Sequence, residues 1–450
     1  MRYQGPCVNE KQLKSLLNPA AYPDPAQDVR LIQTHVSWIF LAGEFVYKVK
    51  KPVDFGFLNF STLDRRRFYC QEEVRLNRRL CPEIYLDVVP LREAPGGLSF
   101  RGDGQVVDYA VKMVRLPAER MADRLLEGGV LTPGTMEQIA VTVAEFHRRA
   151  ERGGEIDGFG SLEVLRRNWE ENFRQAEEFA GVTVTAADLR LIRGRVEGFM
   201  AAHEELFAER VRGGFIRECD GDLHLENICL TDRICIFDCI EFNTRFRYSD
   251  TAADIAFLAM DLEFHGRRDL AAAFLHAYRE ACGDSGALSL VGFYSLYRAF
   301  VRGKVESFRL KDPTIPADEK RGAEERGRRY FRLARGYALR EGLPPCLVVL
   351  CGLSGSGKSA IAAELSRELG LELLSSDLLR KELAGMAPEE RGVAGYDSGL
   401  YAPERSAAVY GEILARAGRL LAAGCGVIVD ATCKRREDRE RLGELSLIHI

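Results

Sequence analysis

The stretch Arg217-Glu218-Cys219-Asp220-Gly221-Asp222-Leu223-His224-Leu225-Glu226-Asn227 decides how the rest of this chain is interpreted. It places Asp222 on a polar loop, five residues ahead of Asn227. An apolar run with a polar break follows and ends at Asp238, which predicts a short hairpin that returns a second aspartate to the loop. One carboxylate for a hydroxyl proton, with an amide and a second carboxylate for magnesium, suits phosphoryl transfer. A plain polar loop ahead of short strands is the competing interpretation.

Bulk composition describes an ordinary globular protein. The chain has 450 residues, of which 46% are hydrophobic and 29% charged, and this length suggests roughly two to three domains. With 63 basic and 67 acidic residues the net charge is -4, which gives no overall nucleic-acid or membrane signature. No signal-peptide core is present, and no run approaches the roughly 20 apolar residues that span a membrane. We therefore expect a cytoplasmic protein without membrane partners.

The twelve cysteines are scattered and include no Cys-x-x-Cys pair. Cys235 and Cys239 have no nearby set of further metal ligands. This pattern argues against zinc and favours reduced, mostly buried thiols.

Two strands are predicted around the turn Ala42-Gly43-Glu44: residues 38–41 and 45–50. Alternation places Lys48 and Lys50 on the same face of the second strand. A lysine on such an apolar strand suits a charge held over nucleotide phosphates, whereas a solvated lysine at a sheet edge is the alternative. We select Lys48 for this role, with Lys50 as the alternative in the same register.

A charged amphipathic helix over 62–80 follows, with Glu72-Glu73 at its middle. A further strand over 106–114 ends at Arg115-Leu116-Pro117, a position that suits an adenine-binding hinge. Beyond it the pattern is helical, and Asp250 is placed to cap the N-terminus of one helix. The expected helices are 136–149, 162–180, 186–210, one that begins at about 250, and 292–308.

Gly221-Asp222-Leu223-His224 with Asn227, and then Ile236-Phe237-Asp238, resemble the loops of the aminoglycoside phosphotransferase and choline-kinase branch of the kinase-like fold. The resemblance covers about residues 30–310. It implies an α+β kinase-like domain with a small β-rich N-lobe and a helical C-lobe. It also implies that Asp222 acts on the acceptor hydroxyl and that Asn227 and Asp238 hold magnesium, while His224 is structural.

The same resemblance assigns a helix glutamate to the strand lysine. Glu73 is the better candidate to pair with Lys48, and an exposed acidic face is the competing interpretation. One departure concerns Asp220, which stands where the family usually has histidine and predicts an altered loop or metal affinity. Ala42-Gly43 is the nearest approach to a glycine-rich nucleotide loop.

A second site begins after a break at 311–317 and a charged helix at 318–340, which we interpret as a solvated amphipathic connector. The apolar strand 346–351 is of the kind buried in a parallel sheet, and it leads into a complete P-loop followed by a helix. Its backbone N–H groups surround phosphates, while Lys358 supplies charge and Ser359 a hydroxyl for magnesium. The loop residues are Gly352, Leu353, Ser354, Gly355, Ser356, Gly357, Lys358 and Ser359.

The strand 371–375 delivers Asp377 and Arg380, which resemble the Asp-x-x-Arg of P-loop kinases of the polynucleotide 5′-kinase and zeta-toxin group. The resemblance makes Asp377 the base on the acceptor hydroxyl and Arg380 a phosphate contact; Asp377 as a helix N-cap is the alternative. A third strand, 426–429, ends in Asp430, which suits outer-shell magnesium binding. The basic residues 434–436 either charge a closing lid or are simply exposed.

The domain order resembles the bifunctional aminoglycoside phosphotransferase/ATP-binding protein family, through 47–53, 60–63 and 301–304 as well. The last six residues look like a translated adapter. We expect the P-loop domain to be incomplete, with the P-loop strand at a sheet edge and poor stability. The predicted domains are 1–310, kinase-like; 311–343, a charged helical linker; 344–444, an α/β P-loop kinase-like domain; and 445–450, an artefactual tail.

The leading hypothesis is an ATP- and magnesium-dependent phosphotransferase that acts on a hydroxyl of a small molecule. The alternative makes the first domain a weakly active nucleotide sensor that regulates a P-loop kinase acting on a nucleic-acid 5′-hydroxyl or a nucleotide-sugar. Nucleic acid is expected as a partner only through the P-loop domain. No pattern in the sequence specifies the acceptor or the oligomeric state.

Overall fold

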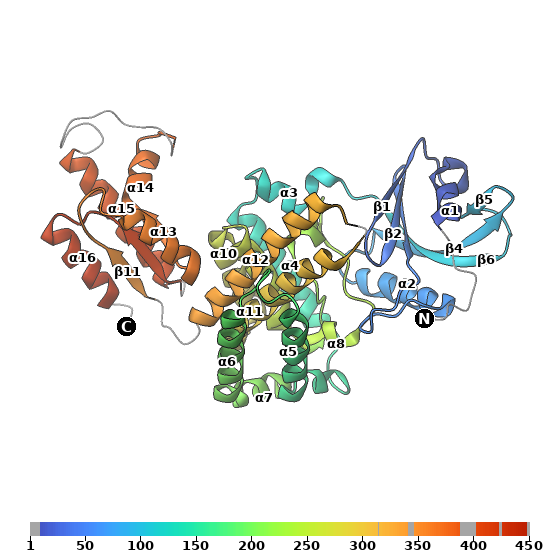
Figure 1. The fold of residues 1–450 in the computed structure, drawn as a ribbon, viewed down its shortest axis with the longest axis horizontal. Helices are drawn as coiled ribbons and strands as arrows, with labels where there is room; N and C mark the ends of the chain where they lie inside the picture. The colour runs from blue at the N-terminus through green and yellow to red at the C-terminus, as the bar shows by residue number, and fades with distance from the viewer. Residues whose placement is uncertain (1–9, 314, 341–345, 388–401, 423–424, 448–450) are drawn as a thin grey trace. The chain divides into compact units, whose positions relative to one another are not determined.

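The structure, a computed structural model, divides the chain into two compact units, residues 1–167 with 204–291 and residues 168–203 with 292–450 (Figure 1). The described residues are 10–313, 315–340, 346–387, 402–422 and 425–447.

A six-stranded antiparallel sheet forms the N-terminal part of the first unit, in the order β1-β2-β3-β6-β4-β5. The strands are β1 Val29–Gln33, β2 Ser37–Ala42, β3 Phe45–Lys50, β4 Tyr85–Ala94, β5 Gly97–Ser99 and β6 Val106–Val114. The expected strands correspond to β2, β3 and β6, while β1, β4 and β5 were not anticipated. β3 lies between β2 and β6, so that Lys48 pairs with Ile39 on one side and with Val111 on the other.

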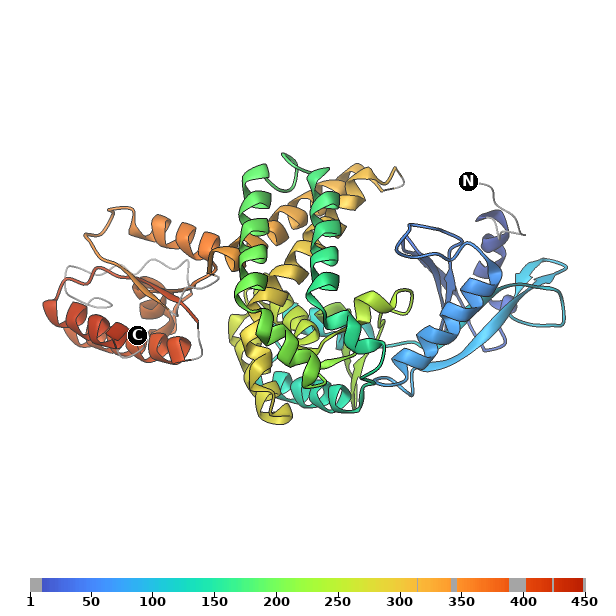
Figure 2. The same ribbon diagram turned by 90° about the horizontal axis from the view of Figure 1, so that it is seen from below.

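Helix α2, Leu63–Asn77, packs against β6 and β4 (Figure 2). It begins where expected because the Thr62 side chain accepts a hydrogen bond from the Arg65 N–H at 3.3 Å. The buried face of α2 carries Glu73 as well as apolar residues. A carboxylate on that face requires cationic partners beneath the helix.

Of the remaining helices of the first unit, α1 Glu10–Leu13 precedes the sheet and the others follow it. The others are α3 Ala122–Glu127, α4 Pro133–Arg149, α7 Glu204–Arg212, α8 Thr244–Arg247, α9 Thr251–Phe264 and α10 Arg268–Cys282. Helix α9 is buried over almost its entire length, and Asp250 caps it as predicted by accepting from the Ala252 N–H at 2.9 Å.

Two small antiparallel pairs flank the polar loop of residues 219–227, hereafter the 219–227 loop. β7 Ile216–Glu218 precedes it and pairs with β10 Tyr248–Asp250. β8 Ile228–Leu230 and β9 Ile234–Ile236 follow it and form the predicted hairpin. The loop is therefore fixed at both ends by strand pairing.

Most of the helical part of the second unit comes from four helices, and both views show α5 and α6 side by side (Figures 1 and 2). They are α5 Leu162–Glu177, α6 Ala186–Ala202, α11 Ser285–Phe308 and α12 Ala317–Arg340. The single helix expected over 186–210 is wrong: His203 ends α6, with both its N–H and its Nδ1 at 3.0 Å from the Phe199 carbonyl, and α7 starts at Glu204. Among the described residues, no helix is both long and apolar enough to cross a membrane.

Helix α12 differs from the solvated connector expected from its charges. Its Phe331 ring packs edge-on against Phe300 of α11, with centroids 5.2 Å apart, and it also approaches Gly303. The aromatic face of this helix is therefore buried, and only the opposite, charged face meets solvent.

The P-loop region contains a three-stranded parallel sheet in the order β11-β13-β12. Its elements are β11 Leu347–Leu350, α13 Lys358–Leu369, β12 Glu372–Ser375, α14 Ser376–Leu383, α15 Pro403–Ala422, β13 Val427–Asp430 and α16 Arg436–Leu447. All three predicted strands are present, and β11 lies at the edge of the described sheet, as expected. Its four residues are only half-buried, whereas β13 in the centre is fully buried. Residues 445–447 form the last turn of α16, and 448–450 lie outside the described residues.

The cysteines depart from the expectation of reduced thiols at one place, because Cys81 and Cys235 form a disulfide. The other nine cysteines in the described part of the chain form no disulfide, and five of them are buried: Cys70, Cys219, Cys229, Cys239 and Cys433. Cys81 and Cys235 are buried as well, so the expectation of mostly buried side chains holds, and that of reduced thiols is wrong for this pair.

Candidate active site

Helix α9 supports the 219–227 loop through two buried carboxylates. Asp254 Oδ2 accepts from the Asp220 N–H at 2.8 Å, and its Oδ1 accepts from the Gly221 N–H at 2.9 Å. Asp261, two turns further along, accepts from the Leu225 N–H at 3.0 Å. Sequence analysis missed both residues. The available signal was a pair of carboxylates in an otherwise apolar helix, since buried carboxylates require donors.

A histidine completes the support beneath the loop. His147 of α4 lies with Nε2 3.2 Å from Asp254 Oδ2 and with Nδ1 2.8 Å from the Tyr278 hydroxyl. His147, Cys219 and Asp254 bring their ligand-type atoms within 4.8 Å of one another. The Cys219 thiol, however, donates to the Ser249 carbonyl, and both Asp254 oxygens bind the loop backbone. In this structure the cluster is therefore a hydrogen-bonded scaffold beneath the loop.

Gly221 is required by the geometry of the loop. Its φ is +85°, and a Cβ atom there would lie 2.8 Å from the Phe246 carbonyl oxygen. A side chain at this position would be strained and would also collide with the backbone that follows β9.

Asp222 and Asn227, which the sequence analysis selected, contact each other directly. The Asn227 Nδ2 donates to the Asp222 carbonyl at 3.0 Å and to its Oδ2 at 3.1 Å. His224 lies with Nε2 3.5 Å from the same carboxylate. The Asp222 side chain remains 32% exposed, so it is oriented by its neighbours and is still accessible to a substrate.

The hairpin returns Asp238 to the loop. The Phe237 N–H donates to the Asn227 carbonyl at 3.0 Å, and the Ile240 N–H donates to the Asp220 carbonyl at 3.2 Å. Asp238 itself has a left-handed backbone with φ 64°, which is uncommon for a residue other than glycine. Its N–H donates to the Tyr85 hydroxyl at 3.2 Å, and its carboxylate is 46% exposed.

Lys48 joins this group from β3. Its Nζ lies 2.6 Å from Asp238 Oδ1 and 2.8 Å from Glu73 Oε1. Burial alone would lower the pKa of Lys48, but the carboxylates of Asp238 and Glu73 outweigh it and hold the pKa well above its usual range. Burial would likewise raise the pKa of Glu73, and the two neighbouring lysines instead lower it to about 2. The predicted pair of Lys48 with Glu73 is therefore present in its ionised form.

Lys50, the alternative lysine, occupies the other oxygen of the same carboxylate. Its Nζ lies 2.6 Å from Glu73 Oε2, contacts Glu241 and sits 4.8 Å from the centre of the Phe60 ring. The Lys50 side chain is only 1% exposed, against 13% for Lys48. Glu241 was missed by sequence analysis, although it is an isolated acid three residues after Asp238.

Asp220 fills the position where the family usually has histidine. It is buried, its Oδ1 accepts from the Asp222 N–H at 3.1 Å, and its Oδ2 has no hydrogen-bond partner among the described residues. Burial, together with the Asp254 carboxylate, raises the pKa of Asp220 to about 8. At neutral pH it is therefore mostly an uncharged carboxylic acid, and it does not add a negative charge beside Asp222.

The P-loop has the expected geometry. Gly355 and Gly357 both have positive φ, and Lys358 Nζ donates to the Leu353 carbonyl at 2.6 Å and approaches Ser356 Oγ at 3.4 Å. The Lys358 side chain thus folds back, and its ammonium group lies against the P-loop.

Ser359, Asp377 and Asp430 belong to one edge of the parallel sheet. Ser359 Oγ donates to Asp430 Oδ2 at 2.6 Å, as expected for two oxygen donors at one magnesium position. Asp430 pairs in register with Leu350 before the P-loop and with Ser375 before α14.

Asp377 and Arg380 both lie on α14, which starts at that edge. Asp377 is not the N-cap weighed earlier, because Ser375 occupies that position and Asp377 lies in the first turn, 3.3 Å from Lys381. The basic residues 434–436 are exposed, as the second interpretation held.

Family models match both halves of the chain. The model described as "Phosphotransferase enzyme family" matches residues 70–289, and the model described as "AAA domain" matches residues 347–446. Uncharacterized proteins of Mycobacterium tuberculosis (Rv2004c) and Mycobacterium bovis (Mb2027c) are 35% identical over 414 residues, which cover 91% of this chain and 79% of each relative.

Solved structures also match. A choline/ethanolamine kinase family protein from Mesorhizobium loti is 15% identical, with a TM-score of 0.42, over 73% of this chain and 98% of that one. An aminoglycoside-3′-phosphotransferase of type VIII is 16% identical, with a TM-score of 0.31, over 64% and 97%. The family models confirm the expected order of a phosphotransferase domain followed by a P-loop domain, and the P-loop region has the expected parallel sheet.

The two lysines should differ in their effect on stability. Lys50→Met leaves two buried carboxylates, Glu73 and Glu241, without their shared cation, and should cost about 3–5 kcal/mol. Lys48→Met should cost clearly less, because Glu73 keeps Lys50 and Asp238 reaches solvent. Urea unfolding followed by Trp38 fluorescence in a Trp169→Phe background reports on the first unit alone. Equal losses in the two variants would contradict the unequal burial of the lysines.

Asp220 should make the first unit less stable as pH rises. Its pKa is about 8 when folded, against an ordinary value of 3.8, so protonated Asp220 contributes stability that is fully present below pH 3.8 and is lost as pH rises through about 8. Asp220→Asn removes this titration. Relative to Asp220→Asn, the parent protein should therefore lose stability between pH 5 and pH 8. A constant difference over that range would mean that Asp220 is ionised throughout.

Proposed function

Because the chain belongs to the family that joins a phosphotransferase domain to a P-loop AAA domain, we propose that its first domain transfers the γ-phosphate of ATP to a hydroxyl of a small molecule. The enzyme class is that of the phosphotransferases with alcohol-group acceptors. We also propose that the acceptor is a small molecule and that individual residues of the first domain have the roles given below.

One observation carries the proposal: Lys48 lies between Glu73 and Asp238, while Asn227 holds both Asp222 and, through its carbonyl, the hairpin that bears Asp238. Strand β3, helix α2 and the stretch from the 219–227 loop to Asp238 thereby bring a cation, three carboxylates and an amide into one group of hydrogen bonds and ion pairs. A plain polar loop would not require the buried lysine and glutamate.

The residues present fit magnesium. Asp238 offers a half-exposed carboxylate, and Asn227 uses its Nδ2 toward Asp222, so its amide oxygen is the atom to bind a metal. Hard oxygen donors of this type are those that Mg²⁺ prefers. When bound, magnesium would neutralise charge on the nucleotide phosphates.

Each side chain then has a role in transfer. Asp222 accepts the proton of the acceptor hydroxyl, and Asn227 fixes the rotamer of that carboxylate. The Lys48 ammonium group turns from Asp238 toward the phosphates, and its salt bridge with Glu73 is kept during this change. Neutral Asp220 adds no second negative charge beside Asp222.

The P-loop domain supports a second nucleotide site. Lys358 would contact the phosphates, while Ser359 and Asp430 would hold a magnesium ion that neutralises phosphate charge there. Asp377 and Arg380 start from the same sheet edge, which favours an acceptor hydroxyl near this site as well. A nucleic-acid 5′-hydroxyl or a nucleotide-sugar is the acceptor class proposed for it.

The first domain can be tested by transfer of labelled γ-phosphate to a metabolite pool, with Lys358→Ala in every sample to silence the P-loop. Asp222→Asn should lower transfer by roughly 10²–10⁴-fold, because the acceptor loses its base. Asp232→Asn, an exposed aspartate in the turn of the β8–β9 hairpin, is the matched control and should leave transfer unchanged.

Two results would count against this function. Equal labelling by Asp222→Asn would remove Asp222 from the reaction. Tight ATP binding by the Lys358→Ala protein with no transfer to any acceptor would instead favour the nucleotide-sensor alternative for the first domain.

The P-loop domain can be tested with 5′-hydroxyl oligonucleotides and labelled ATP. Label transfer should be abolished by Lys358→Ala and strongly reduced by Asp377→Asn, while Glu404→Gln, an exposed acid in the first turn of α15, should have no effect. Transfer that survives Lys358→Ala would place the activity elsewhere in the chain. Parent protein that labels no oligonucleotide would argue against a nucleic-acid acceptor.

A further inference from the structure

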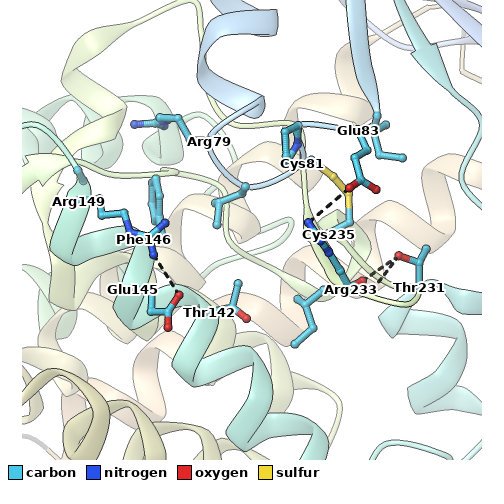
Figure 3. Close-up of a pocket in the computed structure, with 15 residues that line it drawn as sticks. Arg79, Cys81, Glu83, Thr142, Glu145, Phe146, Arg149, Thr231, Arg233 and Cys235 are labelled. Atoms are coloured by element: carbon cyan, nitrogen blue, oxygen red, sulfur yellow. Dashed lines mark hydrogen bonds and ion pairs between the residues drawn. A yellow bond between two sulfur atoms is a disulfide. The ribbon is translucent and has the colours of Figure 1, made fainter.

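Two cysteines from distant parts of the first unit meet beside the proposed kinase-like site. Cys81 follows α2, and Cys235 lies in the middle of β9, 154 residues later in the chain. Their Cα atoms are 5.1 Å apart, which is within the range for a disulfide, and Figure 3 shows the two sulfur atoms joined. Neither residue takes part in the phosphotransfer described above.

The segment at Cys81 is continuous with Glu73 along α2. The Asn77 side chain donates to the Glu73 carbonyl at 2.8 Å, and the Cys81 N–H donates to the Asn77 carbonyl at 2.8 Å. Asn77 Oδ1 also accepts from the Cys239 N–H at 2.9 Å. Cys81 is therefore two hydrogen-bonded steps from the backbone of Glu73, whose side chain holds Lys48.

The segment at Cys235 is continuous with Asp238. Cys235 pairs with Cys229 across the hairpin, and β9 ends at Ile236, two residues before Asp238. The disulfide therefore ties the end of α2 to the strand that positions the proposed metal ligand. Without it, Asn77 and Arg79, which donates to Cys239 Sγ at 3.3 Å, still join these segments by hydrogen bonds.

A cavity of about 500 Å³ gives access to the pair. Cys81 and Cys235 are only 3% and 6% exposed, yet both line this cavity, with Glu83 and Arg233 beside them (Figure 3). Three arginines and two glutamates contribute to its wall, and Arg149 and Arg233 pair there with Glu145 and Glu83. A small thiol or disulfide fits this volume. The charged residues are Arg79, Arg149, Arg233, Glu83 and Glu145.

We propose that Cys81 and Cys235 are a reversible thiol–disulfide site. Its oxidation state controls how well ordered the end of α2 and the segment that carries Asp238 are. On oxidation, one cysteine thiolate attacks a small disulfide and releases one thiol; the second cysteine then resolves the mixed disulfide and releases another. Two cysteine thiols and one small disulfide thus yield one protein disulfide and two small thiols. Any effect on ATP affinity rests on the proposed function of the first domain.

The site itself is tested without nucleotide. The full chain is equilibrated with glutathione at oxidising or reducing ratios, alkylated in denaturant and mapped by peptide mass spectrometry. The expected result is a Cys81–Cys235 link that forms with oxidised glutathione and is removed by reduction. Cys229→Ser, which removes the free thiol across the hairpin, should keep the link, and Cys81→Ser should lose it. Absence of the link under oxidising conditions would overturn the proposal.

The coupling is tested by hydrogen–deuterium exchange of residues 73–81 and 236–241. Reduction should speed exchange in both segments of the parent protein and of Cys229→Ser, and Cys81→Ser should exchange like reduced protein in either buffer. Identical exchange in the oxidised and reduced parent would overturn the coupling.

ATP affinity, measured in a Lys358→Ala background, should weaken by roughly fivefold or more on reduction. If hydrogen exchange responds to redox state but the first domain binds no ATP, the thiol site is supported. Only the proposed function is then contradicted.

Discussion

The carboxylate of Glu73 is bound by two lysines from one strand, and the proposed kinase-like site depends on this shared contact. Each oxygen of Glu73 receives one ammonium group, from Lys48 at 2.8 Å and from Lys50 at 2.6 Å. Because all three side chains are largely buried, their charges require the partners they have in one another, in Asp238 and in Glu241. The contact therefore fixes β3 against α2 and leaves Lys48 beside Asp238.

The two proposed nucleotide sites hold a lysine near phosphates by opposite means. In the P-loop the position of Lys358 follows from a short local stretch, since its partners are Leu353 and Ser356. Lys48 instead depends on Glu73, Asp238 and, through Glu73, on Lys50. Lys358 is positioned by residues of its own loop, whereas Lys48 is positioned by residues that only the folding of the first unit brings together.

This difference explains what the sequence could predict. The P-loop follows from a local pattern of eight residues in a strand–loop–helix context, and the five-residue spacing singled out Asp222 and Asn227 without indicating their contact. Alternation along β3 also placed Lys48 and Lys50 on one face, but the choice between them required the position of Glu73. The structure shows that both bind it, so the two alternatives are parts of one network.

What the sequence could not predict depends on contacts between distant residues. Asp254, His147 and Glu241 look like ordinary polar positions until the fold brings the backbone of the 219–227 loop, or Lys50, against them. The strands β1, β4 and β5 and the end of α6 at His203 likewise lack a decisive local pattern. The Cys81–Cys235 pair is separated by 154 residues, and nothing near either cysteine indicates the other.

Dissolved salt should screen the charges of the two proposed nucleotide sites unequally. At physiological ionic strength the Debye length is about 8 Å, and ions screen charges that face water far more than charges inside the protein. Lys50 and Glu73 are buried, whereas Lys358 is partly exposed and six of the eight P-loop residues are exposed. Raising the potassium chloride concentration would therefore loosen phosphate binding at the P-loop first, while the ionic framework behind Lys48 keeps its strength. Ionic strength is thus a means of separating two nucleotide sites that share a single chain.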